Sequence, residues 1–311
     1  MKRRKPLFAV GVSAVFAASL LAALVFAPGS ALAQTPSAAE LAKRKAHVAS
    51  FRQMNAAAHP VTKSVGAPPA GWTCVGSCGS DNADGVVTLS PTGNSAYEWV
   101  STSGGTNGVG TLPTGPLGSE ADGSTLATPT FAAAAGAPLN FYFNYVTSDG
   151  SGFADYAWAE LFNSSNTPVA LLFTARTESS GSIIPGSGLP APLATLTPSS
   201  VPIIGGAPTW GPLGGLSSGA CYASGCGYTG WVKSSYAIPT AGNYYLKVGV
   251  VNWIDTAYDS GLAVDGVTVS GVPVSPPPSV PGTPVPSSLI LTMLGLAAVG
   301  TFFASQKFAR S

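Results

Sequence analysis

The chain has 311 residues, of which 45% are hydrophobic and only 9% are charged, and it contains 38 glycines and 27 prolines. Between residues 64 and 306 there are twelve acidic and three basic side chains, so this long segment has a net charge near −9. Nucleic acid and anionic lipid are poor partners for such a surface, because both are bound through basic faces.

Residues 1–33 follow the pattern of a secretory signal peptide. A basic stretch at residues 2–5 precedes an apolar stretch that runs to about residue 26, and Ala31 and Ala33 offer a small-residue cleavage site. We expect cleavage after Ala33, because Pro28 and Gly29 lie just before this site. An uncleaved N-terminal membrane anchor is the alternative.

Residues 34–70 are predicted to form a leader with a short exposed helix. Glu40 precedes Arg44 by four residues, a spacing that supports a helix through an ion pair on its surface. The basic cluster of Lys43, Arg44 and Lys45 would contact an acidic partner or a membrane, or the helix would be solvated along its length. We favour the solvated helix.

Residues 71–272 consist of strand and turn patterns. Apolar residues alternate at a period of two in three segments, 139–146, 156–162 and 244–253, and a last strand is expected over residues 262–269. Residues 156–162 and 169–174 should form an antiparallel pair. We therefore predict an all-β fold, an antiparallel two-sheet sandwich with jelly-roll topology, between an N-terminal signal helix and a C-terminal transmembrane sorting helix.

The four cysteines fall into two close pairs. Cys74 and Cys78 form one pair, and Cys221 and Cys226 form the other. Because an exported chain meets an oxidising compartment, we expect two local disulfides, each closing a small loop that glycines help to bend. Cross-pairing between the two loops is one alternative. A zinc site of four thiolates is another, although the spacing differs from that of the usual zinc ribbon.

The sequence offers no catalytic residues for hydrolysis by a triad. Its two histidines, His47 and His59, both lie in the leader, so the sandwich has no imidazole base and no histidine metal ligand. Paired carboxylates of a glycosidase remain, and the nominal candidates are Glu160, Asp155, Asp255 and Asp259. Their spacing does not single them out, and Glu160 is expected to face solvent. We predict that the protein is not an enzyme.

Structural calcium is the metal hypothesis that the loops support. Oxygen ligands suit this ion, and the sequence groups them at three places: Asp81 with Asp84, Asp149 with Asp155, and Asp255 with Asp259 and Asp265. Asp and Asn before Gly also form ordinary turns by bonding their own backbone, which is the alternative interpretation. No other cofactor is expected.

Exposed aromatic residues would provide a surface on which a sugar ring stacks. We expect about two thirds of the six tryptophans to be buried. Trp210, in a loop rich in Gly and Pro, and Tyr258 are our candidates for the exposed recognition surface, together with Asp255 and Asp259.

Residues 273–286 form a Pro-rich linker, and residues 287–311 form a C-terminal membrane segment. The apolar run within it, residues 289–303, would extend only about 23 Å as a helix, which is short of the roughly 30 Å hydrocarbon core of a membrane. Lys307 and Arg310 give the segment a weakly basic end. Such a short span is typical of a processed anchor, and a plain C-terminal membrane helix is the alternative.

This C-terminal layout resembles the PEP-CTERM sorting signal of Gram-negative bacteria. The resemblance rests on Pro284, Val285 and Pro286, followed by the apolar run and the basic end. Val285 occupies the position at which that signal usually has Glu. The resemblance implies export, processing by an exosortase-like enzyme, and either anchoring in the cell envelope or release into the extracellular matrix.

Residues 230–271 resemble the last three strands of jelly rolls of the carbohydrate-binding-module type. They comprise a strand, a turn with Pro, Ala and Gly, a long strand, a loop rich in Asp and a closing strand with an internal Asp. The whole domain resembles the globular part of exported PEP-CTERM proteins that have no assigned activity. We expect a non-enzymatic surface or matrix protein that binds exopolysaccharide. The alternatives are a structural or adhesive matrix protein without a small ligand, and an extracellular glycan hydrolase or lyase.

Overall fold

The fold comes from a computed structural model of the chain, which describes residues 36–55 and 66–277. The predicted signal peptide, the Pro284-Val285-Pro286 motif and the C-terminal apolar segment lie outside the described residues. Within these residues, none of the helices combines the length and the apolar character needed to cross a membrane.

The first of two antiparallel sheets contains seven strands. These are β1 (Thr73–Val75), β4 (Thr106–Asn107), β5 (Glu120–Ala127), β6 (Phe131–Ala133), β8 (Tyr156–Asn163), β9 (Pro168–Arg176) and β14 (Gly242–Trp253). Their order is β1-β5-β14-β8-β9, with β4 paired to β5 and β6 paired to β14. The predicted antiparallel pair over residues 156–162 and 169–174 is confirmed as β8 and β9.

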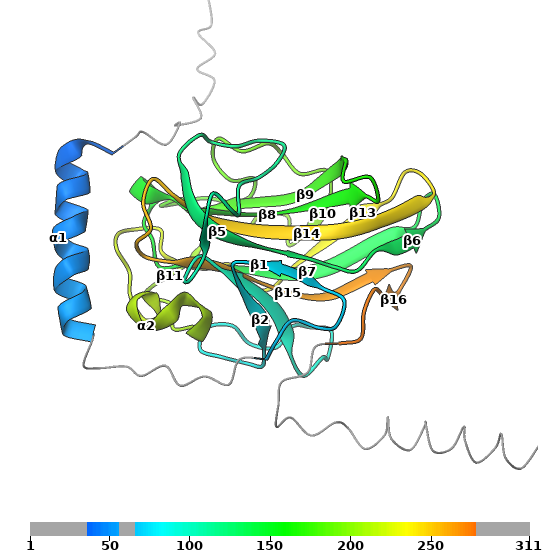
Figure 1. The fold of residues 1–311 in the computed structure, drawn as a ribbon, viewed down its shortest axis with the longest axis horizontal. Helices are drawn as coiled ribbons and strands as arrows, with labels where there is room; N and C mark the ends of the chain where they lie inside the picture. The colour runs from blue at the N-terminus through cyan, green and yellow to red at the C-terminus, as the bar shows by residue number, and fades with distance from the viewer. Residues whose placement is uncertain (1–35, 56–65, 278–311) are drawn as a thin grey trace, which may run out of the picture. The chain divides into compact units, whose positions relative to one another are not determined.

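The second sheet contains nine strands. These are β2 (Ser77–Asp81), β3 (Tyr97–Ser101), β7 (Pro138–Thr147), β10 (Thr195–Thr197), β11 (Ile204–Gly205), β12 (Gly227–Tyr228), β13 (Val232–Ala237), β15 (Ser260–Val269) and β16 (Val272–Pro273). Their order is β10-β13-β7-β15-β3-β2, and β11, β12 and β16 extend it at the side. Figure 1 shows β15 beside β7 in one layer and β14 beside β8 in the other.

The main core fills the space between the two sheets. On β7, Leu139, Phe141 and Phe143 point into it, as the period of two predicts. The ring of Phe143 stacks on that of Phe173 from β9, with 3.8 Å between the ring centroids. These contacts join strands of opposite sheets, so the two-sheet sandwich is confirmed.

Helical structure is limited to two helices and two single turns in the described residues. They are α1 (Ala38–Asn55), α2 (Gly214–Ser217) and the 3₁₀ turns η1 (Ser151–Phe153) and η2 (Gly211–Leu213). The helix α1 begins with a capping box, in which the amide of Ser37 donates to Glu40 and the amide of Glu40 donates to the Ser37 hydroxyl. The prediction that α1 is solvated along its length is wrong at Arg44, which is 1% exposed.

Both disulfides close locally. They join Cys74 to Cys78 and Cys221 to Cys226, so the cross-pairing and zinc alternatives are wrong. Disulfides form and persist in oxidising compartments, which points to an extracellular or periplasmic protein. Closing loops this short contributes about 2 kcal/mol each, so their main effect is on the shape of the loops.

Candidate functional site

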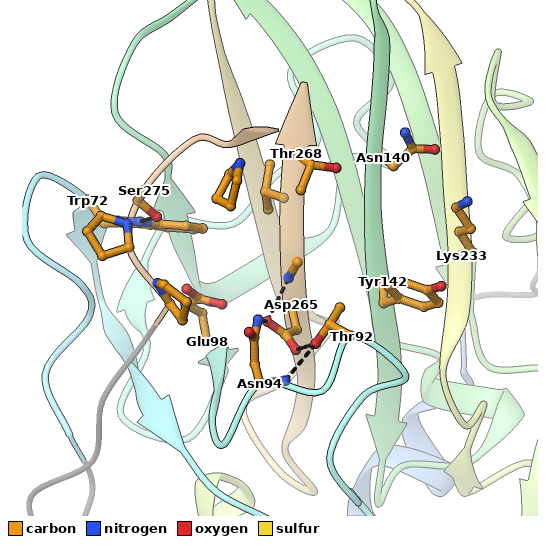
Figure 2. A pocket seen from close by; sticks show the side chains of 15 residues that line it. Trp72, Thr92, Asn94, Glu98, Asn140, Tyr142, Lys233, Asp265, Thr268 and Ser275 are labelled. Atoms are coloured by element: carbon orange, nitrogen blue, oxygen red, sulfur yellow. Dashed lines mark hydrogen bonds between the residues drawn. The ribbon is translucent and has the colours of Figure 1, made fainter. Parts of the chain in front are cut away.

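A groove opens where the pairing of β15 is interrupted. The register between β15 and β7 shifts between Asp265 and Thr268, and the pairing of β15 with β3 ends at Val264 and Glu98. A bulge of this kind leaves residues unpaired and redirects side chains, which makes it a common feature beside binding sites. The resulting groove has a volume of about 320 Å³ (Figure 2).

A row of three side chains crosses the floor of the groove. Lys233 on β13 lies opposite Tyr142 on β7, which in turn lies opposite Asp265 on β15. Residues that lie opposite one another on neighbouring strands share one face of a sheet, so the three side chains form a polar stripe across three strands. Trp72 and Ser275 close one end of the groove, where the indole Nε1 donates to the Ser275 hydroxyl at 2.8 Å (Figure 2).

Asp265 shapes the groove by binding the segment of chain that borders it. Its Oδ2 accepts hydrogen bonds from the hydroxyls of Ser90 at 2.5 Å and Thr92 at 2.7 Å. Its Oδ1 accepts from Asn94 Nδ2 at 2.8 Å and from the amide of Gly266 at 2.6 Å. Because four donors occupy this carboxylate, Asp265 holds Thr92 and Asn94 against the groove and has little capacity left for a ligand.

Glu98 brings an almost fully buried carboxyl group to the groove. It shares a face with Val264, its partner on β15, and with Val100, which packs in the main core, so only 3% of it is exposed. Its Oε2 has no hydrogen-bond partner among the described residues. Buried polar atoms are nearly always paired, and an unpaired one costs about 1–3 kcal/mol.

The surroundings of Glu98 favour the neutral form of its carboxyl group. Burial raises the pKa of Glu98 well above its usual value, and the negative charge of Asp265 raises it further. A neutral carboxyl group can donate one hydrogen bond and accept others. The groove therefore has a donor and acceptor at its buried end, on the side of Trp72, whereas Tyr142 lies beyond Asp265 (Figure 2).

Neither predicted aromatic residue belongs to an exposed platform. Trp210 is 1% exposed, and its Nε1 donates to the hydroxyl of Tyr97 at 2.9 Å. The loop rich in Gly and Pro packs on the second sheet and buries this large ring in a small apolar cluster. Trp210 is therefore buried although it lies in a loop. Tyr258 is also buried, at 5% exposure. The expected buried share is confirmed, since four of the six tryptophans are buried: Trp99, Trp158, Trp210 and Trp253.

The carboxylates named from the sequence have separate structural partners. Asp255 contacts the guanidinium group of Arg44, whereas Asp259 accepts hydrogen bonds from the hydroxyls of Thr102 and Ser217. Glu160 is buried rather than solvent-facing, because β8 is covered on both faces, and it accepts from Thr114 at 2.7 Å. Each of these three carboxylates is therefore engaged with other groups of the protein.

The four residues of the first two groups proposed for calcium likewise have other partners. Asp84 accepts from the amide of Gly211, Asp149 binds Arg44, and Asp155 accepts from the amide of Trp253 and the hydroxyl of Ser260. Asp81 is fully buried on β2. Within residues 36–55 and 66–277, no three His, Cys, Asp or Glu side chains are grouped so that they could hold a metal ion.

Sequence reasoning missed Glu98 and Tyr142 as site residues. A signal for Glu98 was present, because it stands between Tyr97 and Trp99 in a run of otherwise apolar strand residues, where a charge is costly. Asp265 was recognised as an acid inside the closing strand and as a member of a candidate calcium cluster, but not as a residue of this groove. The convergence of these residues depends on strand pairing across four strands, which a local pattern does not reveal.

Comparison with known proteins gives only distant likenesses. No family model matches the sequence, and no curated protein sequence is similar to it. The K3 cleaved adhesin domain of Lys-gingipain from Porphyromonas gingivalis has a TM-score of 0.32 and 11% identity, over 65% of this chain and 91% of that chain. A CBM4 structure has a TM-score of 0.26 and 10% identity, over 64% and 93%.

A third similar structure is the enzymatically active domain of tailspike protein 4 from bacteriophage CBA120. Its TM-score is 0.29 at 10% identity, and the match covers 64% of this chain but only 19% of that chain. At TM-scores this low, these likenesses carry no argument about function. The assignment of a two-sheet antiparallel β-sandwich rests on the strand pairing of this chain itself.

Proposed function

We propose that this protein is an exported, non-enzymatic glycan-binding protein and that the groove beside Glu98 holds the sugar. The observation that carries the proposal is the buried Oε2 of Glu98, which lacks a hydrogen-bond partner among the described residues and lies in a groove of about 320 Å³. A polar atom that loses water on folding and gains no protein partner is stabilised when a ligand supplies one. The fold therefore tolerates a local cost that ligand binding would remove.

The chemistry of the groove suits a saccharide. A sugar ring combines apolar C–H faces with many hydroxyl groups, each of which donates and accepts hydrogen bonds. Trp72 and Tyr142 supply aromatic surface, and Glu98, Asn94 and Asn140 supply neutral donors and acceptors. Pockets that combine apolar walls with a few positioned polar groups are typical of small-molecule sites.

Jelly-roll topology is part of the proposal. Eight principal strands alternate between the sheets in a pattern that places β3, β15, β7 and β13 side by side and β5, β14, β8 and β9 opposite them. This is the order expected when two Greek keys wrap into two four-stranded sheets. The shorter strands extend both sheets at their edges.

The proposal also includes export of the protein and its anchoring in the cell envelope. The signal pattern of residues 1–33, the sorting-signal resemblance of residues 273–311 and the two disulfides all favour a protein that leaves the cytoplasm. The export machinery and an exosortase-like enzyme would be its processing partners, and exopolysaccharide would be its ligand. A structural or adhesive matrix protein without a small ligand is the second candidate.

The test measures binding and stability in the same variants. The purified mature chain is applied to an array of defined neutral and acidic oligosaccharides, and the bound glycans are then titrated against Glu98→Leu and Glu98→Gln. We expect Glu98→Leu to lose binding by about tenfold or more while raising the melting temperature, because it removes an unsatisfied buried carboxyl group. Glu98→Gln should retain part of the affinity.

Glu160→Leu is the matched control. Glu160 is also almost fully buried and also has an Oε2 without a hydrogen-bond partner among the described residues, but it lies on β8 in the other sheet. This change should leave glycan affinity as it is. Unaltered binding by Glu98→Leu, or an array without any bound glycan, would contradict the proposal. Release of shorter products from a bound oligosaccharide would instead favour the hydrolase or lyase alternative.

A further inference from the structure

A second site surrounds Arg44 of the leader helix. Its Nη1 and Nη2 donate to the two carboxylate oxygens of Asp149 at 2.5 Å and 2.6 Å. Its Nε lies 2.5 Å from Asp255 Oδ2, and Nη2 also donates to Asp255 Oδ1 at 2.8 Å and to the carbonyl of Ala257 at 2.5 Å. All three guanidinium nitrogens therefore contact oxygen.

Three aromatic rings complete the enclosure, which we call the arginine cage. The centre of the guanidinium group lies 3.9 Å from the ring centroid of Phe153, 4.6 Å from that of Tyr222 and 5.3 Å from that of Tyr258. A planar guanidinium group can stack on rings and bind a carboxylate through two parallel hydrogen bonds, whereas an ammonium group cannot do both. The cage is therefore shaped for arginine rather than lysine.

The charge balance of the cage requires a cation. Asp149 is fully buried and Asp255 is partly buried, so two carboxylates face one guanidinium group. The buried Asp155 also lies close enough to Asp149 to interact with it electrostatically. Burial raises the pKa of Asp149, and the ion pair with Arg44 acts in the opposite direction. Without a guanidinium group, a carboxylate would be buried and unpaired, which is strongly unfavourable.

The backbone of the cage has local restraints of its own in addition to the hydrogen bonds from Arg44. Ile254 and Tyr258, which flank the Asp255–Ala257 turn, have φ angles of +78° and +63°. These are rare for residues other than Gly, and a β-branched residue such as Ile254 is especially unfavourable there. The Asp255 carboxylate accepts from the amide of Ala257 at 2.9 Å and so holds the turn closed. The turn thus presents its oxygens in a fixed geometry.

Besides Arg44, the helix contributes His47 to the docking contact, and the His47 ring lies 5.9 Å from that of Tyr222 and 6.0 Å from that of Tyr258. Among residues 36–50, Arg44 is the only buried side chain, and Leu41 and Val48 are half-buried. A cleft of about 460 Å³ remains between α1 and the 254–257 turn, so the two surfaces do not pack closely there. The neighbours Lys43 and Lys45 are exposed. Arg44 therefore provides the buried part of the docking contact, and the exposed His47 packs beside it.

We infer that the arginine cage is a binding site for the guanidinium group of an arginine side chain, and that α1 occupies it as a tethered, exchangeable ligand. A tethered ligand has an effective concentration in the millimolar range, so it excludes weaker competitors while it is present. Removing the Arg44 side chain should open the site without altering its walls. The site would then accept a guanidinium compound from solution.

Chemical rescue tests the inference in the full mature chain. The melting temperatures of the wild type, Arg44→Ala and the control Lys45→Ala are measured with millimolar n-propylguanidine or n-butylamine. We expect Arg44→Ala to melt at a lower temperature, and n-propylguanidine to restore about 5 °C or more. The amine should restore much less, and neither compound should move the wild type or Lys45→Ala. If Arg44→Ala does not fold, Arg44→Lys takes its place.

A peptide supplies the second measurement. A fluorescent peptide of residues 36–55 should bind the Arg44→Ala chain at least tenfold more tightly than a peptide that carries Arg44→Ala itself. The inference is overturned if both peptides bind alike, if neither binds, or if the amine rescues stability as well as the guanidine does. Glycan binding at the groove should be the same in all these variants, so the result is independent of the proposed function.

Discussion

Gly249 on β14 lies directly opposite Trp158 on β8, and the indole of Trp158 occupies the space that a side chain at position 249 would need. A Cβ atom at Gly249 would lie 2.6 Å from two carbon atoms of the indole ring. The indole cannot move aside without cost, because its Nε1 donates to the carbonyl of Gly110 at 2.6 Å. The indole of Trp158 thus occupies the space that Gly249 leaves free on the neighbouring strand.

Gly249→Ala should therefore destabilise the sandwich. We expect a loss of about 1–3 kcal/mol, which is typical of overpacking a filled core. Chemical denaturation monitored by tryptophan fluorescence measures it. The control is Gly152→Ala, because a Cβ at Gly152 would meet no atom within 4 Å and its φ is not in the left-handed region. Equal stability of the two variants would show that the indole yields easily.

The pH dependence of stability should report on Glu98. Its pKa is higher in the folded chain than in the unfolded chain, so folding takes up a proton between the two values. Stability from this group is therefore fully present below the ordinary value of 4.5 and is lost as the pH rises toward the folded-state pKa. Glu98→Gln imitates the neutral form at every pH.

The expected result is a stability gap between Glu98→Gln and the wild type that widens as the pH rises above 4.5. Each unit of pKa difference corresponds to about 1.4 kcal/mol. Urea titrations at a series of pH values measure the gap, and the other buried acids cancel because both proteins contain them. A gap that stays constant with pH would mean that Glu98 has an ordinary pKa.

Loss of the charge on Asp149 should release the leader helix. Asp149→Asn keeps the shape of the side chain but leaves Arg44 without its bidentate partner, and breaking a buried ion pair costs about 3–5 kcal/mol. Trypsin should then cleave faster at residues 43–45, as followed by mass spectrometry. Glu178→Gln is the control, because Glu178 is half-buried and lies outside the cage. Cleavage at the wild-type rate in Asp149→Asn would argue that the helix docks by other contacts.

The strands of the sandwich were predictable because their pattern is local. On β7, Leu139, Phe141 and Phe143 alternate with Asn140 and Tyr142, and this period alone fixes the core-facing side. The disulfides were predictable for the same reason, since each joins cysteines only four or five positions apart. Both features follow from neighbours in sequence, and for them the sequence-based expectation holds.

The sites were not predictable because their residues are distant in the chain. Arg44 meets Asp149 across 105 positions and Asp255 across 211, and α1 has no strong apolar stripe that would indicate docking. The burial of Glu98 and Glu160 was not predicted, because charged side chains are usually exposed unless both faces of their strand are covered. Asp149 and Asp155 were named as calcium ligands, and Asp255 and Tyr258 as parts of a recognition surface, but the convergence of these residues around Arg44 was not foreseen.

The loop closed by Cys221 and Cys226 is part of the wall around Arg44. Tyr222 lies inside this loop, and its amide donates to the carbonyl of Ser148, one residue before Asp149. On the other side, the amide of Ser151 donates to the carbonyl of Ser224. A single covalent ring thus restrains both an aromatic wall and the neighbours of the principal carboxylate. Formation of this disulfide should therefore also order the surface on which the leader helix docks.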